Sequence, residues 1–322
     1  MRRSLYRITV LLCTVILAAC SGGGSGDELL DTSWSAPELV TITGYTGHAM
    51  EPFLSRDGNT LFFNNLNADY DPVTAAVNDT NIHYAGKISA TEFVYAGELT
   101  GVNTDLDLVK NELEGVASVD VSLNFFYTDT INYSAGNLNT IYRGTLQISP
   151  TVEVINKVPV GNLKNDLTPS VFGELNMDVE VAADGSMLYF SDNVFSGGAV
   201  PDVSNIGMAV NDGLYNFSVL PNSTVLMANV NTSNLEYAPS ISVDQLELFF
   251  TRCTSPCDNV NMMGIYISNR NSTSDAWSVP RRISSITGLI VEGPTVSSDG
   301  KSLYYHKKDS DGLHRIYRVT RP

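Results

Sequence analysis

Apolar residues along this chain cluster in short runs that are separated by turn-forming residues. The stretch "EPFLSRDGNTLFF" (51–63) is typical, with Pro52, then Asp57-Gly58, then a run of large apolar side chains. Asp-Gly takes the positive φ values that a two-residue primed hairpin turn requires. The apolar run suits a strand that is buried on both faces. The stretch therefore predicts two strands joined by a tight turn.

Four further copies of this pattern follow at intervals of 55 to 64 residues. Five aspartates set the register, because each stands six residues before an aromatic residue: Asp57, Asp120, Asp184, Asp244 and Asp299. Glycine follows three of them, whereas Val121 and Gln245 follow the other two, which predicts longer or different turns in those copies. Self-similarity at a fixed period is the mark of a repeat architecture.

Each copy is followed by further strand-like segments, and long helical periodicity is absent. A third strand is predicted at 81–88, 140–148, 205–210, 263–269 and 314–320. A fourth is predicted at 92–99, 152–160, 215–220 and 276–283. Four short strands repeated five times predict an all-β fold, a five-bladed β-propeller with four-stranded antiparallel blades.

The fifth repeat ends after its third strand, and the N-terminus carries the missing piece. "SWSAPELV" (33–40) matches "AWSVPRRI" (276–283) at Trp34 and Trp277 and at the Ser and Pro that follow each. The N-terminal strand is therefore expected to join the last blade and close the ring, in a single domain over 33–322. A closed ring covers the sheet edges and favours a monomer. A two-sheet sandwich with accidental similarity is the alternative.

The pattern Pro-x-x-Ser-x-Asp-Gly-x-x-Leu-aromatic-aromatic, with a "W-S-x-P" outer strand, resembles the TolB-type, WD40-like propeller repeat of exported bacterial proteins. The resemblance covers the whole expected mature chain and implies a cell-envelope protein. It is informative about the fold and says little about function, because this architecture hosts scaffolds, peptide binders, lyases and hydrolases.

The first twenty residues have the character of an export signal. Three arginines precede an apolar run (8–19) that ends in "LAAC" (17–20), which resembles the bacterial lipobox. The resemblance implies a signal peptide over 1–19, a lipid on Cys20 and a flexible tether over 20–32. Ser21 implies sorting to the outer membrane of a Gram-negative cell, on its periplasmic side or at the cell surface. An ordinary secretory peptide, with Cys20 incidental, is the alternative.

Cysteine content and charge narrow the expected chemistry. Cys253 and Cys257 remain after export and are expected to form a small-loop disulfide. A metal or redox site is the weaker alternative for this pair. With 19 basic and 35 acidic residues the net charge is -16, which argues against nucleic-acid partners. The acidity serves solubility, or else Ca²⁺ binding at loops such as 67–79; no other cofactor is expected.

Function is expected on the face where loops lead into the innermost strands. An acidic residue stands in each of these loops, and loops between the second and third strands add cationic residues. The expected ligand-binding residues at the channel mouth are Glu51, Glu114, Asp178, Glu236, Glu292, Arg252 and His306. A ring of repeat-equivalent carboxylates would form a concave polar site. Alternatively, each carboxylate accepts backbone hydrogen bonds in its own loop.

Three functions are compatible with these features. The main interpretation is a membrane-tethered binding or protein-interaction propeller without assigned catalytic residues. A carbohydrate-active propeller, as a glycosidase-like hydrolase or a glycan-binding protein, is the alternative; a structural envelope component is the third. Acids with raised and lowered pKa values across the channel would favour catalysis, and a large exposed apolar patch would favour a protein partner. His48 is a candidate base or a solvated loop residue.

Overall fold

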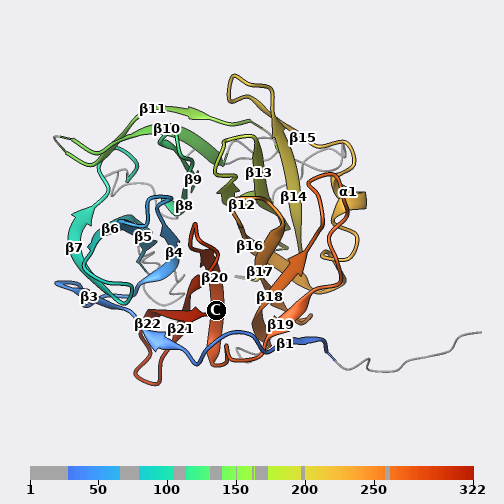
Figure 1. Cartoon of the computed structure of the whole chain (residues 1–322). Helices are drawn as coiled ribbons and strands as arrows, with labels where there is room; N and C mark the ends of the chain where they lie inside the picture. The colour runs from blue at the N-terminus through green and yellow to red at the C-terminus, as the bar shows by residue number, and fades with distance from the viewer. Residues whose placement is uncertain are drawn as a thin grey trace, which may run out of the picture.

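The computed structural model describes residues 28–65, 80–103, 114–130, 140–149, 151–161, 163, 173–196, 200–257 and 262–322. Five sheets surround a central axis (Figure 1). The predicted all-β five-bladed propeller is confirmed. Within the described residues, no helix has the length and apolar character needed to cross a membrane.

The strands of each blade follow one another from the axis outward. Blade 1 contains β4 (Met50–Leu54), β5 (Thr60–Asn64), β6 (Ile82–Lys87) and β7 (Glu92–Glu98). Blade 2 contains β8 (Glu114–Val119), β9 (Asn124–Asp129), β10 (Ile141–Gln147) and β11 (Glu153–Pro159). Blade 3 contains β12 (Glu174–Val181), β13 (Met187–Val194), β14 (Val203–Asn211) and β15 (Phe217–Val219), and the single helical turn α1 (Ser223–Leu226) follows it.

Blade 4 contains β16 (Leu235–Ile241), β17 (Glu247–Cys253), β18 (Met263–Asn269) and β19 (Arg281–Ile283). Blade 5 contains β20 (Leu289–Val296), β21 (Ser302–Lys308) and β22 (His314–Thr320), and its outer strand is β2 (Glu38–Leu39) from the N-terminal segment. The predicted ring closure by 33–40 is therefore confirmed.

The N-terminal segment does more than complete the last blade, because it pairs with three blades in succession. Before β2, β1 (Leu30–Asp31) runs parallel to β19 of blade 4. After it, β3 (Thr41–Thr43) runs parallel to β7 of blade 1. Figure 1 shows this blue segment passing along the outer edge of the three blades. Pairing thus begins at Leu30, earlier than the expected boundary, and blades 1 and 4 gain a fifth strand.

A hydrophobic cluster fills each interface between neighbouring blades. At the interface that closes the ring, Leu61 and Phe63 of blade 1 pack with Tyr304 and Ile316 of blade 5. The second strand of every blade contributes consecutive buried residues to both of its interfaces, which explains why these strands are continuous apolar runs. The ring is held by side-chain burial as well as by strand pairing.

The Asp-Gly turns differ from the predicted two-residue hairpins. In blade 1, Ser55 N–H donates to the carbonyl of Thr60 and Gly58 N–H donates to that of Ser55, so four residues lie between the paired ends. Only the second residue of the Asp-Gly pair is left-handed, with φ of 72° at Gly58. Gln245 takes the same place in blade 4 with φ of 59°, so the turn is kept there without glycine.

The turn of blade 2 is one residue shorter, and its aspartate has a different place. Strand pairing aligns Val119 with Phe125, whereas Leu54 of blade 1 pairs with Leu61. Asp120 therefore occupies the position of Ser55, where its carboxylate accepts the backbone N–H of Asn124 at 2.8 Å. Counted from the first strand, Asp120 stands two residues before the position of Asp57, so the sequence alignment of these two aspartates is wrong.

The matched Trp residues of 33–40 and 276–283 have equivalent surroundings. Trp34 packs edge-on against Phe249 under the guanidinium of Arg321. Trp277 likewise packs against Tyr189 with Arg270 above it. Nε of Arg321 donates to the carbonyl of Gly300, and Nε of Arg270 donates to that of Gln245, each at 2.8 Å. Both carbonyls lie in the turn between the first and second strands of the blade.

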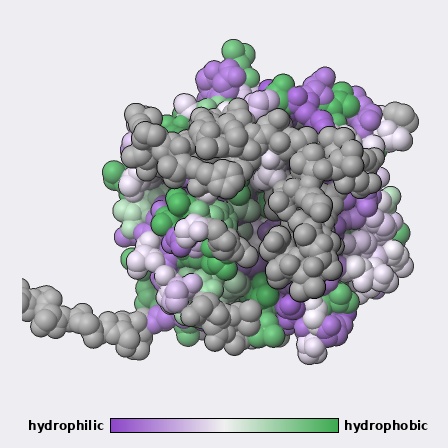
Figure 2. Space-filling model, turned by 180° about the vertical axis from the view of Figure 1, so that it is seen from behind, coloured by the Kyte–Doolittle hydropathy of each residue, from purple (hydrophilic) through white to green (hydrophobic). Residues whose placement is uncertain are grey.

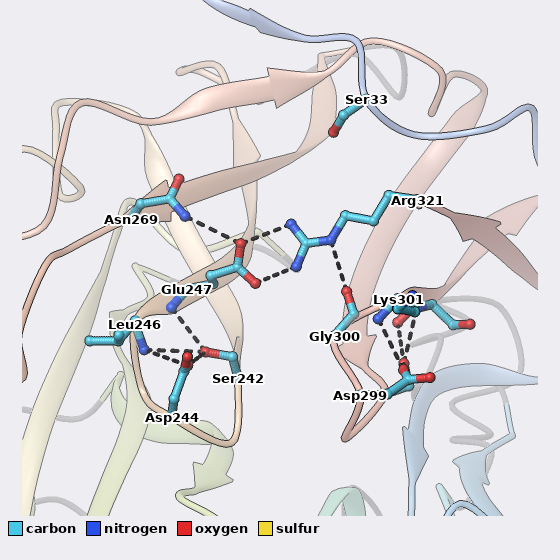
Figure 3. A network of polar contacts seen from close by, with 12 residues as sticks. Ser33, Ser242, Asp244, Leu246, Glu247, Asn269, Asp299, Gly300, Lys301 and Arg321 are labelled. Atoms are coloured by element: carbon cyan, nitrogen blue, oxygen red, sulfur yellow. Dashed lines mark hydrogen bonds and ion pairs between the residues drawn. The ribbon is translucent and has the colours of Figure 1, made fainter.

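Arg321 also links blade 5 to blade 4 through an ion pair with Glu247, whose carboxylate in turn accepts a hydrogen bond from Asn269 (Figure 3). The N-terminal Trp34, the C-terminal Arg321 and blade 4 therefore form one contact region at the closure. Since Trp34 is only 5% exposed, this contact is a core contact rather than a surface one.

Replacing Trp34 with Ala is expected to lower the free energy of unfolding by about 3 to 5 kcal/mol, because it removes a buried ring and leaves a cavity. Urea unfolding monitored by circular dichroism measures this change. Leu30, on the same segment but 54% exposed, is the control, and Leu30→Ala is expected to change stability by less than about 0.5 kcal/mol. Equal small effects would show that the segment does not hold the ring closed.

Candidate functional site

A β-bulge interrupts the innermost strand of every blade and turns the chain toward the axis. Strand register shifts at the same place in all five. The residues next to the shifts have φ between 47° and 62°: Glu51, Val116, Asp178, Ala238 and Gly293. Four of them are not glycine, and this left-handed conformation costs free energy in such residues. Bulges of this kind often re-aim side chains beside functional sites.

Hydrogen bonds link these bulges to the neighbouring blade. At four interfaces, a polar side chain of the second strand accepts the backbone N–H of the bulge residue in the next blade. The pairs, acceptor first, are Asn64 and Val116 (3.3 Å), Ser191 and Ala238 (3.2 Å), Thr251 and Gly293 (3.1 Å), and His306 and Glu51 (3.0 Å). The last pair lies at the interface where the ring closes.

This bond fixes the tautomer of His306. Because Nδ1 accepts the N–H of Glu51, the ring proton of neutral His306 is on Nε2. Nε2 lies 3.3 Å from a carboxylate oxygen of Glu292, close enough for attraction although the angle is not that of a straight hydrogen bond. The residue after Glu292 is Gly293, and this position favours glycine because a Cβ there would lie 3.0 Å from Cα of Glu51. His306 thus contacts the backbone of Glu51 and the carboxylate of Glu292.

A cavity of about 160 Å³ opens among the bulges of blades 1, 3, 4 and 5. Glu51, Asp178 and Glu292 line it, together with Asn193 and Tyr237. The remaining lining residues are apolar: Met177, Phe195, Val200, Pro201, Leu235, Cys257 and Met263. Carboxylates and apolar side chains together make a small amphipathic pocket, which is the usual composition of a ligand site.

Asp178 is buried and has no cationic partner among the described residues. Its carboxylate accepts hydrogen bonds from the hydroxyl of Ser191 at 2.8 Å and from the backbone N–H of Ala238 at 3.3 Å. Burial nevertheless raises the pKa of Asp178 to about 6, and the negative charge of Glu292 contributes in the same direction. This carboxyl therefore keeps its proton to a higher pH than an ordinary aspartate.

Glu292 shares the cavity and titrates in the opposite direction. Burial alone would raise its pKa, but contacts with His306 and the hydroxyl of Tyr237 outweigh burial and hold the pKa below its ordinary value. The hydroxyl of Tyr237 donates a hydrogen bond to Glu292, and burial holds the pKa of this phenol well above its ordinary value. Two carboxyls on one cavity are thus driven apart in pKa, which is the arrangement expected of an acid and a carboxylate with separate roles.

Glu236 and Arg252, two of the predicted binding residues, do not line this cavity. Arg252 Nε lies 2.7 Å from Glu236, which is fully buried, and the guanidinium stacks over Phe250 and Tyr266. Strand alternation explains the difference, because the residues on either side of Glu236 are the ones that reach the cavity. Glu236 also accepts the backbone N–H of Thr232 at 2.9 Å in its own loop, as the alternative interpretation of the carboxylates proposed.

The predicted acids are not repeat-equivalent, contrary to the sequence interpretation. Glu51 and Asp178 are themselves the left-handed bulge residues of their blades. Glu292 stands one residue before the bulge residue of its blade. Glu114 and Glu236 each stand two residues before it. Glu114 begins β8, and its side chain lies outside what the structure describes. Glu51 and Asp178 therefore occupy equivalent positions in their blades, whereas Glu292 occupies a different one.

Sequence reasoning missed Tyr237 and the opposite end of the channel. Arg56, in the Asp-Gly turn of blade 1, donates to Glu180 of blade 3 at 3.1 Å and to the carbonyl of Val181 at 2.6 Å. Both charged side chains are less than a tenth exposed. This pair crosses the axis on the turn side. No sequence pattern indicated it, because the two residues are brought together only by the closed ring.

The remaining predicted residues have structural surroundings. His48 lies with Nδ1 at 3.1 Å from Nδ1 of His314 and does not line the cavity. Cys253 and Cys257 form the predicted disulfide, which builds one side of the cavity. Cys20 and the calcium candidate 67–79 lie outside the described residues, among which no group of three or more metal-binding side chains occurs.

Comparison with solved structures gives the same architecture with unrelated sequences. A structure described as a glycoside hydrolase has a TM-score of 0.60 at 11% identity, with 91% of this chain and 93% of the other covered. A family 117 glycoside hydrolase from Zobellia galactanivorans gives 0.58 at 10% identity, with 91% of both chains covered. A thermostable family-43 glycoside hydrolase gives 0.51 at 14% identity, covering 88% of this chain and 91% of that one.

No family model and no curated protein matches the sequence. TolB from Acinetobacter baumannii is also similar in structure, with a TM-score of 0.41 at 14% identity over 86% of this chain and 54% of its own. The likenesses to the three glycoside hydrolases agree with the five-bladed fold that the TolB-type repeat pattern implied. At such identities they establish the fold alone.

Opposite pH effects are expected from two substitutions in the cavity. Because the folded-state pKa of Asp178 is raised to about 6 from 3.8, stability falls as pH rises between these values. Asp178→Asn, which keeps an acceptor for Ser191, is expected to raise the free energy of unfolding above pH 6 by roughly 1 to 3 kcal/mol. This gain should disappear below pH 4.

Glu292→Gln is expected to lower stability at pH 7, since a lowered folded-state pKa contributes stability that is present above the ordinary value and lost as pH falls through the folded one. Urea unfolding from pH 3 to pH 8 measures both variants. Two variants that change stability in the same direction at pH 7 would contradict the opposite pKa shifts.

Proposed function

We propose that this chain is a carbohydrate-active propeller that binds a saccharide in the cavity formed by Glu51, Asp178, Tyr237 and Glu292. One observation carries the proposal: Asp178 and Glu292 share a cavity, with their pKa values moved in opposite directions. Structural ion-pair networks also shift pKa values, but a pair of shifts inside an amphipathic cavity is typical of glycoside hydrolysis.

The chemistry follows from the surroundings of each carboxyl. Asp178 keeps its proton up to about pH 6 and, in its protonated form, donates it to the glycosidic oxygen as the bond to the anomeric carbon breaks. Ionised Glu292, held by Tyr237 and His306, stabilises the positive charge that develops on the sugar ring. Glu51, which is only half-buried, accepts the proton of the water that adds to the anomeric carbon.

The apolar wall supports a saccharide over a smaller polar ligand. Phe195, Met177 and Leu235 line the cavity together with the carboxylates. The C–H face of a sugar packs on such residues while its hydroxyls reach the polar side. A cavity of about 160 Å³ suits a single sugar ring, so binding of a chain end is favoured over binding across the middle of a polymer.

The interpretation as a protein-interaction module has weaker support. The TolB likeness has too low a TM-score to weigh in its favour. Seen from behind, the parts of this face that the described residues form carry both hydrophobic and hydrophilic residues (Figure 2). Structural likeness to glycoside hydrolases supports the saccharide proposal only through the shared fold.

Hydrolysis of aryl glycosides by the purified mature chain tests the proposal. A panel covering common pentoses and hexoses should include one substrate that is cleaved. Asp178→Asn is expected to reduce kcat at least about 100-fold, because it removes the proton donor. Asp275→Asn, an exposed site in the β18–β19 loop, is the charge-matched control and should retain full activity. Cleavage that survives Asp178→Asn and Glu292→Gln would place catalysis elsewhere.

Lipid anchoring at Cys20 and location at the outer membrane are part of the proposal and rest on the signal-like N-terminus. Metabolic labelling with a palmitate analogue in a Gram-negative host should mark the wild-type chain and not Cys20→Ser. Fractionation should move the variant from the membrane to the soluble fraction. Label retained by Cys20→Ser would exclude this anchor.

A further inference from the structure

A second, smaller space adjoins the cavity along the axis of the ring. Its volume is about 20 Å³, which is enough for one water molecule. Glu51 of blade 1 lines both spaces. In blades 3, 4 and 5, one residue of the innermost strand lines the cavity and the next residue lines the smaller space: Asp178 and Val179, Tyr237 and Ala238, Glu292 and Gly293. The two spaces therefore follow one another along the axis, and we call the smaller one the axial space.

The Arg56–Glu180 ion pair lies at the other end of the axial space. Glu180 lines the space itself. Its carboxylate accepts hydrogen bonds from Arg56 at 3.1 Å and from the hydroxyl of Ser118 at 2.7 Å. Both charged side chains are less than a tenth exposed. A molecule in the axial space therefore exchanges with solvent through the cavity.

Thr295 presents a buried hydroxyl to the axial space. This residue lines the space and is 2% exposed, and its hydroxyl has no hydrogen-bond partner among the described residues. At the equivalent positions of blades 2 and 4, the hydroxyls of Ser118 and Ser240 accept a backbone N–H from the next blade, at 2.9 and 3.1 Å. Thr295 makes no such bond to the described residues of blade 1. Because a buried hydroxyl without a partner costs free energy, a water molecule in contact with Thr295 is favoured.

Glu51 is the second polar partner for such a water. Its carboxylate accepts the side-chain N–H of Asn64 at 3.0 Å, and its backbone N–H donates to His306 at 3.0 Å. These bonds hold Glu51 in place. A carboxylate accepts about four hydrogen bonds, so the bond from Asn64 leaves room for one from a water. Thr295 can then donate to the water oxygen while the water donates to Glu51.

We infer that the axial space binds the water that is consumed in glycoside hydrolysis, and that Thr295 is the residue that positions it. This inference rests on the proposed function. Glu51 takes a proton from the water as the water oxygen bonds to the anomeric carbon. The glycosidic bond breaks in the same step, and its oxygen leaves with the proton of Asp178. The proton then returns from Glu51 to Asp178 through solvent.

The difference in size between the two spaces lets sugar and water bind together. A sugar ring fits the cavity of about 160 Å³ but not the axial space of about 20 Å³. The sugar therefore displaces water from the cavity and leaves the water that Thr295 holds. A water that is already oriented beside the reacting carbon lowers the entropic cost of its attack.

Substitutions that remove or keep the hydroxyl test this inference. Thr295→Val keeps the shape of the side chain and is expected to lower kcat about tenfold, with KM within about twofold of the wild-type value, because Thr295 contacts the water and not the sugar. Thr295→Ser keeps the hydroxyl and should retain the wild-type kcat. Thr273→Val makes the same change at an exposed position of the β18–β19 loop and should alter neither kcat nor KM. Thermal unfolding of each variant confirms that it is folded.

High-resolution crystal structures of the mature chain give a readout that does not depend on activity. The wild-type structure is expected to show a water within hydrogen-bond distance of both Thr295 Oγ1 and a carboxylate oxygen of Glu51. In the Thr295→Val structure this water should be lost or displaced.

The possible failures are distinct. If a glycoside is cleaved and Asp178→Asn reduces cleavage but Thr295→Val keeps the wild-type kcat, the inference is wrong while the proposed function stands. The inference is also wrong if Thr295→Ser loses as much kcat as Thr295→Val, since the hydroxyl is then not responsible, or if no water lies beside Thr295. If the water is present but no glycoside is cleaved, the proposed function is wrong, and the catalytic role of this water is wrong with it.

Discussion

The site depends on a hydrogen bond that joins the two ends of the ring. The backbone N–H of Glu51 in blade 1 donates to Nδ1 of His306 in blade 5, 255 residues away in the sequence. This bond directs Nε2 of His306 toward Glu292. Neither the tautomer nor the position of Glu51 is fixed until the N-terminal segment has closed the ring. Closure is therefore a condition of the chemistry as well as of the fold.

The same hydrogen bond between neighbouring blades recurs around the ring, and at two interfaces its acceptor also contacts a cavity carboxyl. Second-strand side chains accept bulge N–H groups at four interfaces. Where that acceptor is Thr251, the contact is structural. Where it is His306 or Ser191, the same side chain also contacts a cavity carboxyl, Glu292 or Asp178. The left-handed bulges that point these acids inward carry conformational strain, which is common at functional sites.

Much of the fold could be predicted from the sequence, because the repeated apolar runs and the Trp34 match reflect burial between neighbouring sheets. The site was predicted only in part. Glu51, Asp178 and Glu292 come together, but Glu236 stands one residue before the position of Glu292 and two before that of Glu51 and Asp178, and sequence spacing does not reveal bulges. The Arg56–Glu180 pair was missed since its partners are 124 residues apart. Contacts across the axis leave no local pattern.

The cavity at the channel mouth is expected to contain one carboxyl with a raised pKa, Asp178, and one with a lowered pKa, Glu292. An NMR titration of the side-chain carboxyl carbons of Asp178 and Glu292 in the folded protein measures this directly. We expect Asp178 to titrate near pH 6 and Glu292 below its ordinary value of 4.5. Titration of both carboxyls at the ordinary values of Asp and Glu would contradict the account.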